Sequence, residues 1–168
     1  VDINCDMGEG YGPWQLGDTS DDVLMGLISS ANIAAGFHAG DPNLIDRTVR
    51  LAAEHGVGVG AHPGYRDLQG FGRRRIDGSA AELVNDIIYQ VGALKGFCEA
   101  EGVQLNHLKP HGALYGMAAR TEDMAHAVAD AAAIFKLPVL GMTGTCHERI
   151  YPQRGLTFIA EFYADLDY

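Results

Sequence analysis

Four short segments of this sequence combine carboxylate, imidazole and ammonium groups with amide side chains that could orient a ligand. Their polar residues are Asn4, Asp6 and Glu9, then Asn32, His38 and Asp41, then His62, and finally Lys109 and His111. Carboxylates and imidazoles move protons near neutral pH, and a positioned ammonium stabilises negative charge that develops during a reaction. These residue types suit hydrolytic chemistry, provided that the fold brings the four segments together.

The alternation of apolar runs and helical periodicity predicts how the fold could do this. Six short runs rich in β-branched residues are separated by helical segments, which is typical of repeated βα units around a mainly parallel sheet. We predict strands at residues 1–6, 29–35, 57–61, 104–109, 138–142 and 156–162. Since the carboxyl ends of parallel strands meet at one rim, the four polar segments are expected to share it.

Helix signals support the same organisation. Asp41 followed by Pro42 is an N-cap with proline at the first helical position, and Ser79 with Glu82 forms a capping box. The helix after Ser79 should bury one stripe, made of Leu83, Ile87, Val91, Leu94 and Cys98. Six strands are fewer than the roughly eight of a common barrel. We therefore expect residues 1–168 to be one domain whose sheet is open or lacks C-terminal strands.

Ordinary structural roles compete with function at several of these positions. Asp41 precedes a proline, so it is more often only a helix cap. A lone His after a strand is usually a half-buried structural residue, but the joint placement of His62 and His111 favours function. Lys109 lies in an apolar turn, where a buried ammonium needs a carboxylate or an anionic substrate beside it. No role is assigned to the four other histidines, His55, His107, His126 and His147.

Composition and motifs exclude several classes of protein. A net charge of −10 and a pI near 4.9 argue against a nucleic-acid-binding surface. No apolar stretch approaches the roughly 20 residues that cross a bilayer, and we expect a cytoplasmic protein. The sequence has no P-loop motif, and the glycine-rich residues 8–13 lack the third glycine of a dinucleotide fingerprint. The three cysteines are expected to be free thiols, and a homo-oligomer is left open.

Five ordered motifs resemble those of the LamB/YcsF, or lactam-utilisation, family, and the resemblance runs from residue 1 to residue 168. They are residues 4–10 (NCDMGEG), 30–41 (SANIAAGFHAGD), 60–63 (GAHP), 71–73 (FGR) and 109–115 (KPHGALY). Ala35 stands where the family usually has Cys, which argues against thiol chemistry there. The segment after Glu161 lacks the family's Arg. Family members continue for several tens of residues further, so the chain is expected to be truncated relative to them.

The family is understood as one of the three components of 5-oxoprolinase, and the resemblance implies an irregular (β/α) barrel of the glycoside hydrolase/deacetylase type. It also implies ATP-dependent opening of 5-oxo-L-proline to L-glutamate together with the B and C subunits of that enzyme. On this hypothesis Asp6 or His62 is the general base, while Lys109 and His111 stabilise negative charge. The substrate would be held by Asn4, Glu9, Asn32, His38 and Asp41.

Two other interpretations stay open at this point. In a metal-dependent amide or ester hydrolase, Asp6, His38 and His62 would hold a divalent ion that lowers the pKa of bound water. No His-x-His or His-x-x-x-His motif decides for or against such an ion. Alternatively, a non-catalytic module would bind a small carboxylate or sugar without turnover.

Overall fold

The computed structural model describes residues 1–15 and 19–164, and within these ranges all six predicted strands are confirmed. In chain order the elements are β1 (Asn4–Met7), α1 (Asp21–Met25), β2 (Ser30–Ala34), α2 (Pro42–His55), β3 (Gly58–His62), α3 (Ala80–Ala100), β4 (Leu105–Leu108), α4 (Gly112–Arg120), α5 (Glu122–Phe135), β5 (Val139–Gly141), α6 (Cys146–Gln153) and β6 (Phe158–Ala160). Most strands are shorter than the predicted ranges, so some residues expected within strands lie just beyond them.

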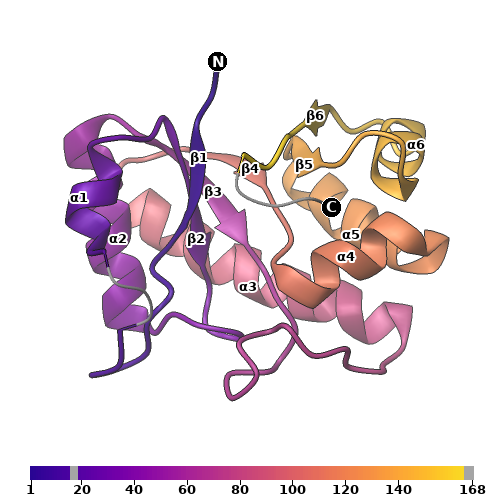
Figure 1. The fold of residues 1–168 in the computed structure, drawn as a ribbon, viewed down its shortest axis with the longest axis horizontal. Helices are drawn as coiled ribbons and strands as arrows, with labels where there is room; N and C mark the ends of the chain where they lie inside the picture. Colours follow the sequence, from indigo (N-terminus) through magenta and orange to yellow (C-terminus); the bar gives the residue numbers. More distant parts are fainter. Residues whose placement is uncertain (16–18, 165–168) are drawn as a thin grey trace.

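The strands form one parallel sheet whose spatial order is the order of the sequence, from β1 to β6. Figure 1 shows this sheet as an open, curved half-barrel with the helices arranged around it. Helices α2 and α3 contact the central strands, and α3, α5 and α6 pack in succession along the outside. The predicted fold class, an α/β half-barrel with fewer strands than a closed barrel, is confirmed.

The register of the sheet separates an apolar face from a polar one. Met7, Ile33, Ala61 and Leu108 are successive partners across the first four strands, and all four are buried in the core beneath the helices. Side chains of neighbouring residues in a strand point to opposite faces. The residues one position earlier therefore point to the inner, concave face. There the same register aligns a second row, which we call the polar row: Asp6, Asn32, Gly60 and His107.

The helices begin and end where the local sequence signals place them. In α2 the carboxylate of Asp41 accepts hydrogen bonds from the N–H groups of Asn43 and Leu44, and Gly56 ends the helix in the left-handed conformation. Ser79 and Glu82 make both hydrogen bonds of the capping box at the start of α3. The predicted stripe of α3 is buried, and it packs into the same core as the apolar row of the sheet.

Two further expectations can be compared with the described residues. Cys5, Cys98 and Cys146 are free cysteines, as predicted. None of the helices within residues 1–15 and 19–164 combines the length and apolarity that crossing a bilayer would require.

The N-cap of α2 generates a prediction for stability. Replacing Asp41 by Ala should lower the free energy of unfolding by about 1 kcal/mol at neutral pH, because backbone donors lose their acceptor. The hydrogen bond from the Gly12 N–H, followed by those from Leu44 and Asn43, holds the pKa of Asp41 below its ordinary value. This stabilisation is therefore complete above the pKa of the unfolded chain and is lost as pH falls through the folded-state pKa.

Urea unfolding of both proteins at neutral and acidic pH measures this difference. Asp41→Asn is the matched control, because Asn caps helices about as well as Asp and should retain most of the stability at neutral pH. A deficit in Asp41→Ala that persisted unchanged into acid would contradict the ionised cap.

Candidate active site

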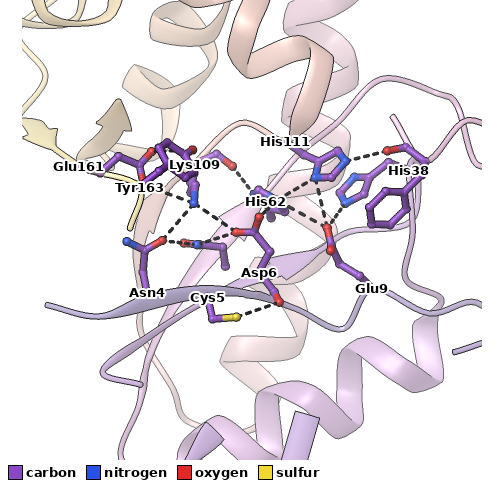
Figure 2. Close-up of polar contacts among 12 residues, drawn as sticks. Asn4, Cys5, Asp6, Glu9, His38, His62, Lys109, His111, Glu161 and Tyr163 are labelled. Carbon is purple, nitrogen blue, oxygen red and sulfur yellow. Dashed lines mark hydrogen bonds and ion pairs between the residues drawn. The ribbon is translucent and has the colours of Figure 1, made fainter. Parts of the chain in front are cut away.

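The polar row and the strand ends beside it form one connected group of side chains on the concave face, shown in Figure 2. Among the residues that the sequence singled out, the group contains Asn4, Asp6, Glu9, Asn32, His38, His62, Lys109 and His111. Asp41 is the exception, because its carboxylate is engaged by backbone N–H groups at the start of α2. Its suggested role in substrate binding stays a prediction.

Lys109 is a buried ammonium placed between two carboxylates. Its Nζ lies 3.3 Å from Asp6 Oδ1 and 3.3 Å from Glu161 Oε2, and it donates a hydrogen bond to Asn4 Oδ1 at 3.1 Å. The ring of Tyr163 lies beneath the same group, with its centroid 5.1 Å from Nζ. Burial would lower the pKa of Lys109, but Asp6 and Glu161 outweigh it and raise the pKa above its ordinary value. The side chain is therefore a fixed positive charge.

Asn32 is held in one orientation by three side chains. Its Nδ2 donates to Asn4 Oδ1 at 2.8 Å and to Asp6 Oδ1 at 2.9 Å, while its Oδ1 accepts from His107 Nε2 at 2.7 Å. The His107 ring reaches Asn32 by crossing over Gly60, where a Cβ would stand only 1.9 Å from His107 Nε2. Burial lowers the pKa of His107 to about 4, so the ring is neutral and can donate only through one nitrogen.

Three histidines and Glu9 form a second group, which we call the imidazole cluster. His62 Nδ1 donates to the Lys109 carbonyl at 2.7 Å, and His111 Nε2 donates to the Phe71 carbonyl at 2.7 Å. The opposite ring nitrogens, His62 Nε2 and His111 Nδ1, lie 3.0 Å apart. The carboxylate oxygen Oε1 of Glu9 is 3.0 Å from His38 Nε2, 3.2 Å from His111 Nδ1 and 3.7 Å from His62 Nε2. The four residues offer donor atoms that lie within 4.8 Å of one another and could hold a metal ion.

The loop between β3 and α3 fixes the geometry of this cluster. Phe71 has a positive φ of 54°, which is unusual for a residue with a side chain and strains the backbone by about 1–3 kcal/mol. Gly72 also has a positive φ, and a Cβ there would lie 2.7 Å from His38 Cβ and 2.8 Å from His111 Cδ2. A glycine is therefore needed for the loop to approach the stacked rings of His38 and His111, whose centroids are 3.7 Å apart.

Asp6 joins the two groups, because Oδ1 faces Lys109 and Oδ2 lies 3.2 Å from His62 Nε2. Burial would raise the pKa of Asp6, but the charge of His62, its hydrogen bond and the charge of Lys109 outweigh burial and hold the pKa well below its ordinary value. For His62, burial acts to lower the pKa, while the Asp6 and Glu9 carboxylates raise it above its ordinary value. Asp6 is therefore ionised, with a ring beside it that readily takes up a proton.

The other carboxylate and histidine of the cluster are also shifted. Burial would raise the pKa of Glu9, but hydrogen bonds from His111 and His38 lower it to about 2. Burial lowers the pKa of His38 to about 4, although its hydrogen bond to Glu9 favours the charged form. Glu9 therefore accepts a hydrogen bond from a neutral His38 ring at neutral pH.

A cavity of about 810 Å³ opens beside this site. Asp6 and Glu9 line it, whereas His62 and Lys109 lie behind them and do not. The remaining lining comes from the segment after β1, from α1 and from the start of α2: Gly10, Gly12, Trp14, Gln15, Thr19, Ser20, Asp21, Asp22, Leu24, Asp41, Asn43, Leu44 and Arg47. A small molecule in this cavity would thus meet the two carboxylates first.

Sequence reasoning missed two members of the site, Glu161 and His107. Glu161 was placed inside the predicted strand 156–162, but β6 ends at Ala160, so Glu161 is a strand-end residue like the other site residues. His107 was given no role, although it lies two residues before Lys109 and so shares its face of β4. In both cases the strand-end and same-face rules contained the signal.

The contact between His107 and Asn32 leads to a second prediction. His107→Leu should lower the free energy of unfolding by about 1–3 kcal/mol, because Asn32 Oδ1 would be left buried without a donor. His55→Leu is the control, since His55 is exposed at the end of α2 and such substitutions change stability by about 0.5 kcal/mol or less. Chemical denaturation of the two variants measures the difference. Equal effects would show that the Asn32 contact contributes nothing.

Comparison with known proteins gives the site its context. The LamB/YcsF family profile matches residues 1–168. A protein of Pseudomonas aeruginosa that is named as a 5-oxoprolinase A-type subunit is 54% identical over all of this chain and 68% of its own length. The protein of the same name from Natranaerobius thermophilus is 51% identical over all of this chain and 65% of its length. The chain thus spans about two thirds of these relatives.

The fold is also found in a solved structure of the same kind. The crystal structure of the lactam utilization protein from Thermus thermophilus superimposes with a TM-score of 0.92 at 47% sequence identity, covering 96% of this chain and 66% of that protein. With a profile match over its whole length and relatives more than half identical to it, this chain belongs to the LamB/YcsF family.

Proposed function

We propose that this chain provides the lactam-hydrolysing site of an ATP-dependent 5-oxoprolinase, which opens 5-oxo-L-proline to L-glutamate together with B and C subunits. The names of its relatives support this assignment. The observation that carries it is the position of Asp6, an ionised carboxylate that faces a cavity and is backed by Lys109 and His62.

A lactam is a poor electrophile, so its hydrolysis needs activation as well as a positioned nucleophile. Coupling to ATP would activate the carbonyl, and the partner subunits are the proposed source of ATP binding because this chain has no P-loop. The chain itself would then orient water and accept its proton.

Between the two candidate bases, access favours Asp6. The side chain of Asp6 is 34% exposed and lines the cavity, whereas that of His62 is 1% exposed and lies behind it. In this proposal Asp6 takes the proton from water, and His62 positions Asp6 and shares the proton through the 3.2 Å contact. Lys109 keeps Asp6 ionised and adds positive charge near the developing oxyanion.

The substrate also carries a carboxylate, for which the cavity offers one cationic side chain within the described ranges. Arg47 lines the cavity from α2, on the same side as the N-terminal segment of that helix. A guanidinium group matches the planar geometry of a carboxylate. We assign the recognition of this end of the substrate to Arg47.

Asp6→Asn tests the central claim. The substitution preserves shape and the contact with Asn32, but it removes the base, so ATP-dependent glutamate formation by the complex with B and C subunits should fall by about 10²- to 10⁴-fold. Asp22→Asn is the matched control, because Asp22 lines the same cavity without joining the network around Asp6. Asp6→Asn with wild-type turnover, in a complex that still assembles, would remove Asp6 from the mechanism.

Arg47→Met tests substrate recognition separately. Loss of a charged hydrogen bond to the substrate should raise the KM for 5-oxo-L-proline by about 10-fold or more with little change in kcat. Arg50→Met removes a guanidinium one turn further along α2 that is paired with Asp46 and Glu101, so its KM should stay unchanged. Equal steady-state parameters in the two variants would count against Arg47.

A further inference from the structure

The imidazole cluster contains an arrangement that its own hydrogen bonds leave unbalanced. His62 Nδ1 and His111 Nε2 each carry a proton, because each donates to a backbone carbonyl, of Lys109 and Phe71 respectively. In the neutral rings the remaining nitrogens, His62 Nε2 and His111 Nδ1, therefore hold lone pairs. These two lone pairs face each other at 3.0 Å, with a Glu9 carboxylate oxygen beside both. Three electron-rich atoms at such distances require a cation among them, which is either a shared proton or a metal ion.

The separations of these three atoms fit a single metal ion. They are 3.0 Å between the two ring nitrogens, 3.2 Å from His111 Nδ1 to Glu9 Oε1, and 3.7 Å from His62 Nε2 to Glu9 Oε1. Zinc binds His nitrogen and carboxylate oxygen at about 2.0–2.2 Å, and ligands at that distance in a tetrahedron lie about 3.3–3.5 Å apart. The cluster is thus close to the geometry that an ion would need without rearrangement.

The outer contacts of the two rings are those expected of metal ligands. A ligating His nearly always donates its other ring N–H to a carboxylate, a backbone carbonyl or water, which fixes the tautomer and the ring orientation. Both His62 and His111 have such a carbonyl at 2.7 Å. Their side chains are 1% and 3% exposed, so their orientation is also set by packing.

His38 differs from these two rings. Its Nδ1 is buried and has no hydrogen-bond partner, so a proton on that nitrogen would lack an acceptor. The ring is better satisfied with its proton on Nε2, which donates to Glu9 Oε1 at 3.0 Å. His38 is then an outer partner that orients the Glu9 carboxylate. Asp6 lies on the remaining side, with Oδ2 3.2 Å from His62 Nε2 and facing the cavity.

We propose that Glu9, His62 and His111 form a binding site for one divalent transition-metal ion of the zinc class, with His38 as an outer partner and Asp6 beside the open position. Imidazole and carboxylate ligands suit zinc rather than magnesium or calcium, which prefer oxygen ligands. This set replaces the combination of Asp6, His38 and His62 that the sequence suggested. The site is independent of the proposed reaction, since binding can be measured on this chain without partner subunits or substrate.

Metal binding is tested by stripping the purified chain with a chelator and titrating it with Zn²⁺, with Mg²⁺ as a comparison. Calorimetry and elemental analysis after desalting should show one Zn²⁺ per chain and no retained Mg²⁺. Glu9→Gln and His111→Gln should each weaken Zn²⁺ binding by more than about 100-fold, because loss of an outer partner alone costs about 10- to 100-fold. His55→Gln removes an exposed histidine far from the cluster and should bind like the unaltered chain.

X-ray absorption of the Zn²⁺-loaded, unaltered chain gives a readout that does not depend on how the variants fold. It should show only nitrogen and oxygen neighbours at about 2.0–2.2 Å, including two imidazoles. Sulfur at about 2.3 Å would place the ion on a cysteine and overturn the proposal. Failure to retain Zn²⁺, or full affinity in both Glu9→Gln and His111→Gln, would equally overturn it and would mean that the two rings share a proton instead.

Discussion

The register of the parallel sheet is the constraint on which the rest of this molecule depends. One alignment across β1 to β4 places Met7, Ile33, Ala61 and Leu108 under the helices and the polar row on the concave face. Because side chains alternate along a strand, a shift of one residue in any strand would exchange the two sets. The hydrophobic core that stabilises the fold therefore also fixes the position of the site.

The concave face tolerates its charges because nearly every one has a partner of opposite sign. Lys109 is 5% exposed and would destabilise the fold by several kcal/mol if it stood alone. Asp6 and Glu161 come from the first and last strand ends, so the pairing also joins β1 and β4 to the segment after β6. Asn32 and His107 satisfy the remaining hydrogen-bonding groups. Charge compensation thus links segments that are far apart in the chain.

Asp6 is the point of contact between this charge network and the imidazole cluster, as Figure 2 shows. Its two carboxylate oxygens face different partners, Lys109 on one side and His62 on the other. The carboxylate is held ionised by these partners and lies next to the facing ring nitrogens of His62 and His111. A base for water and a site for a cation are therefore neighbours in this family member, and their proximity follows from the strand ends that carry them.

The sequence by itself determined the order of strands and helices, the cap at Asp41, the capping box at Ser79, and the meeting of polar segments at one rim. These depend on local signals and on the rule that parallel strands end together. Only the tertiary structure decided which atoms meet. It brought Glu9 and His111 to His62, His107 to Asn32 and Glu161 to Lys109, because such contacts depend on register, on side-chain direction and on the loop at Phe71.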